Sequence, residues 1–591
     1  MVAVETTRDS SSSHALALRS AGAGTPKNLG SVSVNGREKK RVKVKAPKEA
    51  RPSCLRCVRF GATCDGYPKP PSTASIVTTR KLVPKTKAAL VHLQQPTRSP
   101  FQEESEYRYF RYYCEEVATR IQGTLKTELW NQLIPQAGET QPYIRHAIIA
   151  IGALSRSRKL IGWKKEPSLS DPHNRYALVQ YCKALKGMRE SIKDSVDDGR
   201  NALLACLLVF CFESLQGHQA VASAHAANLV NLFLRWRWSS IDNIKFNSSS
   251  PRVSAESIRV EECLHDAFGG LDIQALLFVD KRPTSMHYRL KEEMNTAIDL
   301  MMPTSEFTSL KDCRNVWQIM MRRNLHFINA ARSAATFDFP DSENTTVDGE
   351  EEDPIAIMVP GNNAWNTPKN GLSAHIPSSL IVERDTYIKD IQRYHEASEK
   401  LFATYSSTPP LLATENEKRE YLQTQMLKIH AAFNILLLAR TFFPPESVYD
   451  DLLPTFRSVV DLSSQVAPFL SGTCEEGTLF RFNIGIIAPL AQTSMVCRDA
   501  STRARAIDIL FSLPGYREGI WDSLAVAHIS QWIRDIEVEW ADERGFVPGD
   551  RRASLAGVEI KLQERTAKVT AIQGQGPGMK GMLERSSVLK W

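Results

Sequence analysis

Helical periodicity, sustained from residue 101 to about residue 545, is the feature that most restricts the folds open to this chain. Apolar residues recur at every third or fourth position, which places them on one face of an amphipathic helix. One such stripe consists of Ile144, Ala147, Ile148, Ile151 and Leu154. Roughly a dozen segments of this kind, with few credible strands among them, predict a mainly α body.

Three further segments support the helical prediction. Residues 202–212 are apolar all round, as expected of a buried central helix. The stripe over residues 422–436 lies behind a capping box formed by Thr414 and Glu417 and ahead of two consecutive prolines. A third stripe covers residues 521–540 and predicts one more amphipathic helix.

The last part of the chain changes its period. Apolar and polar residues alternate over residues 558–562 and again over 567–571, which predicts a two-stranded β-hairpin packed on the helices. Repeated glycines open residues 574–591, which we expect to form a flexible tail. The predicted fold class is therefore mainly α, with a large helical domain at residues 101–573 and a small C-terminal β-hairpin.

Positive charge is concentrated at the start of the chain. Residues 1–100 hold 19 Lys and Arg against five acidic residues, a balance of +14, so the +8 of the whole chain leaves −6 for the remainder. A basic arm on a mildly acidic body predicts a polyanionic partner for the arm alone. Residues 1–35 are rich in Ser, Ala and Gly and are expected to be disordered, whereas prolines make residues 68–100 a linker.

Three cysteines lie between these two segments, within residues 36–67. Cys54 and Cys57 are separated by two residues, so a short turn can direct both sulfurs at one metal ion, and Cys64 follows after six more residues. Nearby guanidinium groups would favour thiolates and would also face a phosphate backbone. These groups belong to Arg51, Arg56 and Arg59. The alternative is a set of surface thiols without a function in a reducing compartment.

Residues 51–67 contain Pro-Ser-Cys-Leu-Arg-Cys, then a Phe-Gly step, a last cysteine and Asp-Gly-Tyr. On these residues the segment resembles the second half of the fungal two-zinc, six-cysteine DNA-binding cluster. In that family six thiolates hold two zinc ions, and the first half directs a basic helix end into the major groove of DNA. The resemblance implies that Cys54, Cys57 and Cys64 are zinc ligands.

The chain departs from this family in the first half of the cluster. The first three family cysteines would fall near Gly36, Lys39 and Ala46, and no cysteine precedes Cys54. Three thiolates cannot complete two tetrahedral zinc sites, and a single zinc would need a fourth ligand from elsewhere. Either the cluster is a relic, or its first half was lost by truncation or by a misplaced exon boundary.

A basic run over residues 39–45 precedes the cysteines. Its composition is typical of a nuclear-import signal, and the alternative is a solvated basic linker. Together with the three arginines it forms the predicted contact set for double-stranded DNA: Lys39, Lys40, Arg41, Lys43, Lys45, Arg51, Arg56 and Arg59. We expect these residues to contact phosphates, and we expect the protein in the nucleus.

Four motifs follow one another along the body: Glu128-Leu-Trp-Asn-Gln-Leu133, residues 144–154, residues 224–229, and Gly545-Phe-Val-Pro548 with Arg551-Arg552. In this order they are similar to the fungal-specific regulatory domain that follows the zinc cluster in many such factors. The resemblance covers about residues 100–573. It implies a regulator of metabolic genes whose helical body senses a small-molecule effector or binds co-regulators. A homodimer is left open, because no sustained heptads follow the linker.

Patterns of catalysis and of membrane insertion are absent from the sequence. The pairs Asp197-Asp198 and Asp450-Asp451 lack a third carboxylate one turn on, which a diphosphate-binding metal site would need. No G-x-S-x-G, H-E-x-x-H or Walker motif occurs. The apolar run at 202–212 is shorter than the ~20 residues that span a bilayer. We therefore expect neither an enzyme nor a membrane partner.

The leading prediction is a nuclear regulator of RNA polymerase II genes, of metabolism or secondary metabolism, that binds promoter DNA through its N-terminal module and uses zinc as its cofactor. The alternative is a helical regulator or interaction module that does not bind DNA and carries a relic zinc cluster. The absence of cysteines before Cys54 keeps both hypotheses open.

Overall fold

The computed structural model describes residues 55–61, 63, 99–124, 127–194, 199–246, 255–278, 280, 282–334, 336–337, 374–406, 414–442, 448–471, 477–543, 545–574 and 582–591. The chain divides into two compact units, Met1–Gln94 and Gln95–Trp591. In the first unit, the described part is helix α1 (Leu55–Phe60) and the residues just after it. The predicted disordered segment at 1–35 lies outside the described residues, as does nearly all of the predicted linker at 68–100.

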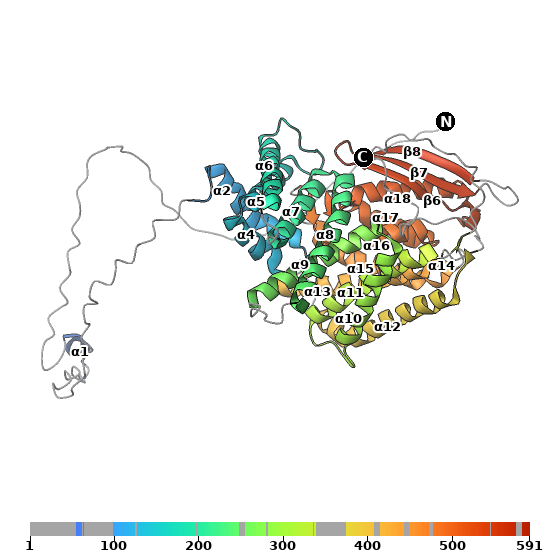
Figure 1. Ribbon diagram of the computed structural model, residues 1–591, viewed down its shortest axis with the longest axis horizontal. Helices are drawn as coiled ribbons and strands as arrows, with labels where there is room; N and C mark the ends of the chain where they lie inside the picture. Colours follow the sequence, from blue (N-terminus) through green and yellow to red (C-terminus); the bar gives the residue numbers. More distant parts are fainter. Residues whose placement is uncertain are drawn as a thin grey trace, which may run out of the picture. The chain divides into compact units, whose positions relative to one another are not determined.

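The second unit is mainly helical, as predicted (Figure 1). Its helices are α2 (Glu104–Tyr112), η1 (Tyr113–Val117), α3 (Ala118–Gln122), η2 (Leu129–Leu133), α4 (Ile134–Thr140), α5 (Pro142–Ile161), α6 (Pro172–Asp194), α7 (Gly199–Gln216), α8 (Gln219–Phe246), α9 (Ala255–Phe278), α10 (Thr284–Met301), α11 (Leu310–Ala334), α12 (Ser378–Ser406), α13 (Glu415–Ala439), α14 (Val448–Asp451), α15 (Leu453–Ser471), α16 (Ile487–Val496), α17 (Ala500–Phe511), α18 (Ser523–Val538) and η3 (Gly549–Arg551). Its strands are β1 (Thr336–Phe337), β2 (Ala374–His375), β3 (Leu479–Arg481), β4 (Tyr516–Glu518), β5 (Trp521–Asp522), β6 (Ser554–Lys561), β7 (Thr566–Gly574) and β8 (Met582–Lys590).

Helix α7 is the buried central helix that the apolar run at 202–212 predicts. Every residue from Leu203 to Gln216 is buried, and the helix packs on α5 and on α8. Phe212 stacks on Tyr181 of α6 with ring centroids 4.0 Å apart. Fully burying a side chain such as Leu or Phe contributes roughly 1.5–3 kcal/mol, so a helix buried on all faces is held by packing rather than by helix propensity.

Helix α5 confirms the predicted stripe, because Ile144, Ile148 and Ile151 are all fully buried. The helix begins at Pro142, whose fixed φ suits the first helical position, and it ends at Ile161, just before Gly162, which has a φ of +72°. A Cβ on Gly152 would lie 2.3 Å from the backbone oxygen of Tyr109. Glycine is therefore what allows α2 to lie directly on α5.

The predicted capping box is present at the start of α13. The Thr414 side chain accepts a hydrogen bond from the backbone N–H of Glu417, and the Glu417 carboxylate accepts one from the backbone N–H of Thr414. Helix α13 ends at Ala439, before the two prolines. Local sequence signals thus fix both ends of this helix.

The C-terminal sheet contains the predicted hairpin, β6–β7, but it also has a third strand. Residues 582–590, expected as part of a flexible tail, form β8, which pairs antiparallel with β7 over 566–574. Alternate positions of β8 point inward, yet Arg585 and Ser587 are among them, so the apolar alternation that reveals a strand is weak there. Figure 1 shows the sheet beside α18, and Val558 and Val569 pack with Ile529 of that helix.

A second, smaller sheet orders β3, β4 and β5, with β3 parallel to β4 and β4 antiparallel to β5. The helix predicted from the apolar stripe at 521–540 is shorter in the structure. Trp521 lies in β5, and α18 begins only at Ser523. The turn between β4 and β5 requires Gly519, which has a φ of +56° and packs against Gln274. Across the described part of the chain, none of the helices combines the length and the apolar character that crossing a membrane requires.

Candidate functional site

The predicted metal and DNA site lies in the first unit, of which the structure describes a part. Cys57 is half-buried in α1, and Arg59 of the same helix is exposed. Arg56 also lies in α1, and its side chain is not among those described. Gly61 follows the helix with a φ of +64°, a turn that residues with a side chain rarely adopt. The remaining predicted residues lie outside the described ones: Cys54, Cys64, Lys39, Lys40, Arg41, Lys43, Lys45 and Arg51.

Zinc binding therefore stays a prediction. No group of three His, Cys, Asp or Glu side chains among the described residues could hold a metal ion, and these residues include Cys57 but not the other two predicted ligands. Thiolates are suitable zinc ligands, and three of them supply one ligand fewer than a tetrahedral site needs.

A cavity of about 130 Å³ lies within the second unit and is the candidate site of the helical body. Its lining comes from η2, α9, α11 and α13, and from the chain around β3 and β4. Most of the lining is apolar and includes Trp130, Ile273, Met321, Leu427 and Phe482. The cavity thus combines helices from both ends of the unit with the small sheet.

One rim of the cavity is polar and partly exposed. Asp266 and Arg314 form an ion pair there with a distance of 3.1 Å between Oδ2 and Nη2. Burial raises the pKa of Asp266, and the neighbouring guanidinium acts in the opposite direction. Thr124 and Thr127 are also only partly buried, so a ligand can reach the cavity from this rim.

His430 of α13 is a partly buried titratable group of the lining. Its Nε2 lies 2.9 Å from the backbone oxygen of Gly485, which can only accept a hydrogen bond, so Nε2 carries the hydrogen. Burial lowers the pKa of His430 to about 4, although this hydrogen bond raises it. At neutral pH the imidazole is therefore uncharged, and its Nδ1 is a hydrogen-bond acceptor.

The chain at 485–487, on the wall of the cavity, is held by a buried carboxylate. Glu518 accepts hydrogen bonds from the backbone N–H groups of Gly485, Ile486 and Ile487 at 2.8, 2.8 and 3.0 Å. Burial raises the pKa of Glu518, and these three hydrogen bonds oppose the rise. A Cβ on Gly485 would lie 2.3 Å from the carboxylate, so this contact requires glycine.

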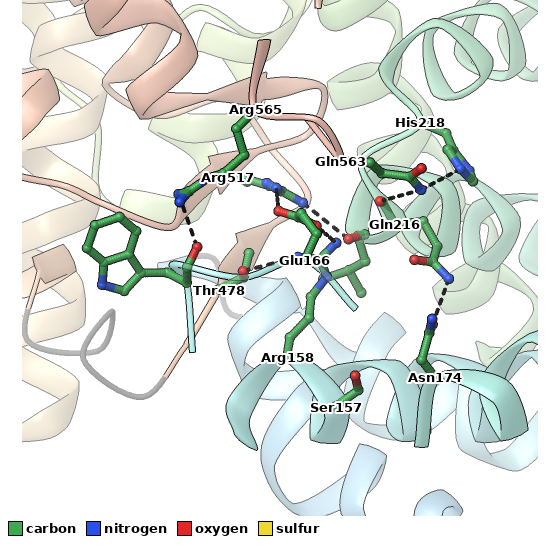
Figure 2. Close-up of polar contacts among 12 residues, drawn as sticks. Ser157, Arg158, Glu166, Asn174, Gln216, His218, Thr478, Arg517, Gln563 and Arg565 are labelled. Carbon is green, nitrogen blue, oxygen red and sulfur yellow. Dashed lines mark hydrogen bonds and ion pairs between the residues drawn. The ribbon is translucent and has the colours of Figure 1, made fainter. Parts of the chain in front are cut away.

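An ion-pair network, called the Glu166 clamp below, joins the first helices to the small sheet (Figure 2). Glu166 accepts a hydrogen bond from Arg158 Nη2 at 2.7 Å and one from Arg517 Nη2 at 3.2 Å. Arg517 also pairs with Asp522 at 2.9 Å. These four residues, Arg158, Glu166, Arg517 and Asp522, make up the clamp, and both guanidiniums are at most 4% exposed.

The ionisation of the clamp follows from its burial and charges. Burial raises the pKa of Glu166, but Arg158 and Arg517 outweigh it and hold that pKa below its ordinary value. Burial, together with the charge of Arg517, lowers the pKa of Arg158 to about 10, even though Glu166 raises it. Arg158 and Glu166 are therefore both charged at neutral pH, and the clamp is a buried electrostatic contact between segments far apart in sequence.

The turn between β6 and β7 reinforces the clamp. Arg565 donates hydrogen bonds to the backbone oxygens of Lys164 and Trp163, at 2.9 and 3.2 Å. Its φ of +52° is unusual for a residue with a side chain, and such strain persists only where surrounding contacts hold it. Figure 2 also shows Gln563 directed at His218, with 2.8 Å between the two Nε2 atoms.

Strand β4 connects the clamp to the cavity. Successive residues of a strand point to opposite faces, so Tyr516 lines the cavity while Arg517 reaches the clamp. A shift of β4 would therefore act on both sites at once.

Sequence reasoning found part of this arrangement. The motif at 128–133 supplies Trp130 of the cavity. The motif that ends at Arg552 supplies a buried ion pair, in which Arg552 Nη1 lies 2.7 Å from Glu537 Oε2. The clamp and His430 were missed. Charged residues 351 positions apart, such as Glu166 and Arg517, leave no periodic signal in the sequence.

Residues 108–322 match the family described as Fungal specific transcription factor domain. The match begins in α2 and ends in α11. It therefore includes Arg158 and Glu166 of the clamp, whereas Arg517 and Asp522 follow it.

Curated proteins are similar to this chain over shorter stretches. Transcription regulator lscL of Purpureocillium lilacinum is 25% identical over 204 residues, which are 32% of this chain and 46% of that protein. Aspercryptin biosynthesis cluster-specific transcription regulator atnN of Emericella nidulans is 27% identical over 200 residues, 30% of this chain and 31% of that protein. Sterol uptake control protein 2 of Saccharomyces cerevisiae is 25% identical over 115 residues, 19% of this chain and 11% of that protein.

The chain thus spans less than half the length of these curated relatives. No solved structure matches it. The matched family and the first two relatives are transcription regulators and not enzymes.

Proposed function

We propose that this chain is a nuclear transcription regulator of the fungal zinc-cluster type, which binds promoter DNA through its N-terminal module. The observation that carries the proposal is the match of residues 108–322 to the fungal-specific transcription factor domain, in a helical body that follows a strongly basic segment. The first two relatives are named as transcription regulators, and one is named for a biosynthesis cluster. This naming supports genes of metabolism or secondary metabolism, transcribed by RNA polymerase II, as targets.

In this proposal the basic residues hold the DNA. Lysine and arginine side chains bind phosphates, and such binding weakens steeply as salt rises. Arg59 is exposed on α1, which suits a phosphate contact. The three cysteines would hold at most one zinc ion with a further ligand, because the first half of the family cluster has no counterpart in the sequence. Sequence preference should be small without that half, which reads the bases.

The helical body would receive the regulatory signal. Its cavity is reached from a partly exposed rim, and β4 joins the cavity to the Glu166 clamp. A small-molecule effector in the cavity would thereby change the contact between the matched region and the C-terminal part. A co-regulator or a second copy of the chain would bind the outside of the same body.

A second candidate function rests on the missing cysteines. A helical regulator that does not bind DNA and keeps a relic cluster would also have a body of this kind. DNA binding separates the two functions.

Fluorescence anisotropy of the full chain with a labelled DNA duplex tests the proposal. The variant K39A/K40A/R41A should bind more weakly, and the slope of log K against log salt should fall by about 0.9 for each phosphate that the variant no longer neutralises. The control R108A/K311A/K400A removes the same charge from exposed positions of the body and should bind as the wild type does. Absence of duplex binding by the wild-type chain would favour the function without DNA, and equal binding by the two variants would remove residues 39–41 from the DNA contacts.

The same pair of variants tests localisation. As fluorescent fusions in fungal cells, K39A/K40A/R41A should accumulate in the cytoplasm, whereas the control variant should remain nuclear. A nuclear signal that both variants retain would remove the import role of residues 39–41.

A further inference from the structure

Three lysines lie together on the outer face of the C-terminal sheet. Lys568 of β7 is exposed and stands between two fully buried residues, and successive residues of a strand point to opposite faces. Thr566, on the same face of β7, pairs with Lys561 of β6 on one side and with Lys590 of β8 on the other. Because neighbouring strands are roughly 4.8 Å apart and alternate residues roughly 7 Å apart, the three lysines start within about 10 Å of one another.

Two further segments reach this end of the sheet through Arg565, in the turn between β6 and β7. Arg565 donates to the backbone oxygens of Lys164 and Trp163 (Figure 2), and its own backbone oxygen accepts a hydrogen bond from the N–H of Trp591 at 3.2 Å. Lys164 and Lys165 are both exposed. The positive side chains that these contacts bring together are called the basic patch below: Lys164, Lys165, Lys561, Arg565, Lys568 and Lys590.

The charge of the basic patch is opposite to that of the body as a whole. The chain beyond residue 100 sums to −6, whereas the six positive side chains of the patch face two carboxylates of the same strands and turn, Glu559 and Glu564. Glu559 pairs with Lys561 at 3.6 Å, and Lys568 and Lys590 have no carboxylate partner among the described residues. The fold thus builds a positive surface that the net charge of the body does not reveal.

The composition of the patch favours a nucleic acid over a protein as its partner. Lysine is depleted at the core of protein–protein interfaces, whereas protein–DNA interfaces are rich in positive charge. Each strand of B-DNA carries one phosphate per about 3.4 Å of helix axis, so lysines about 10 Å apart can contact separate phosphates. Five of the six residues are lysines, whose long side chains carry a point charge that does not require one fixed geometry.

We propose that the basic patch contacts the phosphate backbone of the DNA duplex that the N-terminal module binds. The inference rests on the proposed function, because it adds a contact on the helical body to that of the basic arm. A second contact from the same chain raises the overall affinity, and phosphate contacts do so without reading the sequence. The polyanionic partner expected for the arm alone is then shared by the body.

Fluorescence anisotropy of the full chain with a labelled duplex tests this contact. K561Q/K568Q/K590Q should bind more weakly, and the slope of log K against log salt should fall by about 0.9 for each of these lysines that contacts a phosphate. The control R108Q/K311Q/K400Q removes the same charge from exposed positions outside the patch. It should keep the wild-type slope.

Lysine acetylation read by mass spectrometry locates the contact in the wild-type chain and needs no variant. With a saturating duplex, acetylation of Lys561, Lys568 and Lys590 should slow down. Acetylation of Lys311 and Lys400, which are also exposed, should keep its rate. Poly-L-glutamate in place of the duplex tests an acidic polypeptide as the partner.

The results separate this inference from the proposed function. A wild-type chain that does not bind the duplex would refute both. If the wild type binds but K561Q/K568Q/K590Q has the salt slope of its control, or if the duplex leaves the acetylation of the three lysines unchanged, the body does not contact DNA and binding by the arm stands. Protection of these lysines by poly-L-glutamate and not by the duplex would assign the basic patch to an acidic protein instead.

Discussion

Replacing Glu166 with Gln removes the shared carboxylate of the clamp and keeps the shape of the side chain. Arg517 would retain Asp522, at 2.9 Å, whereas Arg158 has no other carboxylate within ion-pair distance among the described residues. The Arg158 side chain is 2% exposed, so its charge cannot be hydrated in place. Leaving one buried charge uncompensated costs about 3–5 kcal/mol, and we expect E166Q to lower the free energy of unfolding by this amount.

Neutralising the partner should reverse much of the loss. In E166Q/R158M the uncompensated cation is replaced by an apolar side chain, and replacing a buried charge with a well-packed apolar residue often costs little. We expect the double variant to be about 2 kcal/mol or more above E166Q in its free energy of unfolding. Urea unfolding followed by circular dichroism measures both, provided that the dependence on denaturant is the same in each variant.

The exposed pair of Arg111 and Glu115 supplies the control. Its side chains are 60% and 56% exposed, and E115Q should cause no measurable change. If E166Q unfolded at the same urea concentration as E115Q, or if R158M failed to raise the stability of E166Q, the clamp would not be a stabilising contact of the body.

Three other predictions follow from single residues. Native mass spectrometry should detect at most one zinc ion per wild-type chain, and Cys57→Ser should abolish this binding. Two bound ions in the wild type would contradict the incomplete cluster. His430 is neutral when folded, with a pKa of about 4 against ~6.5 unfolded, so its contribution is complete above pH 6.5 and is lost as the pH falls toward 4. The variant H430Q keeps a donor for Gly485. Between pH 6.5 and pH 4, acidification should therefore lower the free energy of unfolding of H430Q by about 1.4 kcal/mol less per pH unit than it lowers that of the wild type, as measured by urea titrations. An unchanged slope would refute a neutral imidazole. Gly519→Ala should prevent stable folding, as judged by the absence of a cooperative melt, because its Cβ would lie 1.7 Å from Gln274 Oε1 at a φ of +56°; a melt like that of the wild type would contradict this packing.

The sequence by itself determined the elements that depend on neighbouring residues. The stripe of α5 recurs in the structure as buried isoleucines, and the capping box at Thr414 and Glu417 starts α13 where it was predicted. Both signals are local, since side chains three or four residues apart meet on a helix, and a capping side chain reaches only the next turn. The apolar run of α7 likewise predicted its burial, because a helix without a polar face can be stable only inside a protein.

Tertiary structure alone decided the strands at the ends of helices and sheets. Trp521 fits the apolar period of α18, yet it pairs in β5, and Asp522 caps the helix by accepting a hydrogen bond from the backbone N–H of Ala525 at 3.1 Å. Strand β8 forms where the sequence indicates a flexible end, because β7 offers it an unpaired edge. A strand acquires its hydrogen bonds from a partner elsewhere in the chain, so its own residues record it less clearly than a helix.

The cavity and the Glu166 clamp also depend on partners elsewhere in the chain, so the sequence motifs alone did not predict them. Trp130 was found within a motif, but the cavity it lines exists only once α9, α11 and α13 pack together with the small sheet. Arg158 and Glu166 are ordinary charged residues until folding removes water from around them and places Arg517 beside them. Local periodicity determines which face of a helix is buried, whereas the pairing of charges across hundreds of residues is decided only when those faces meet.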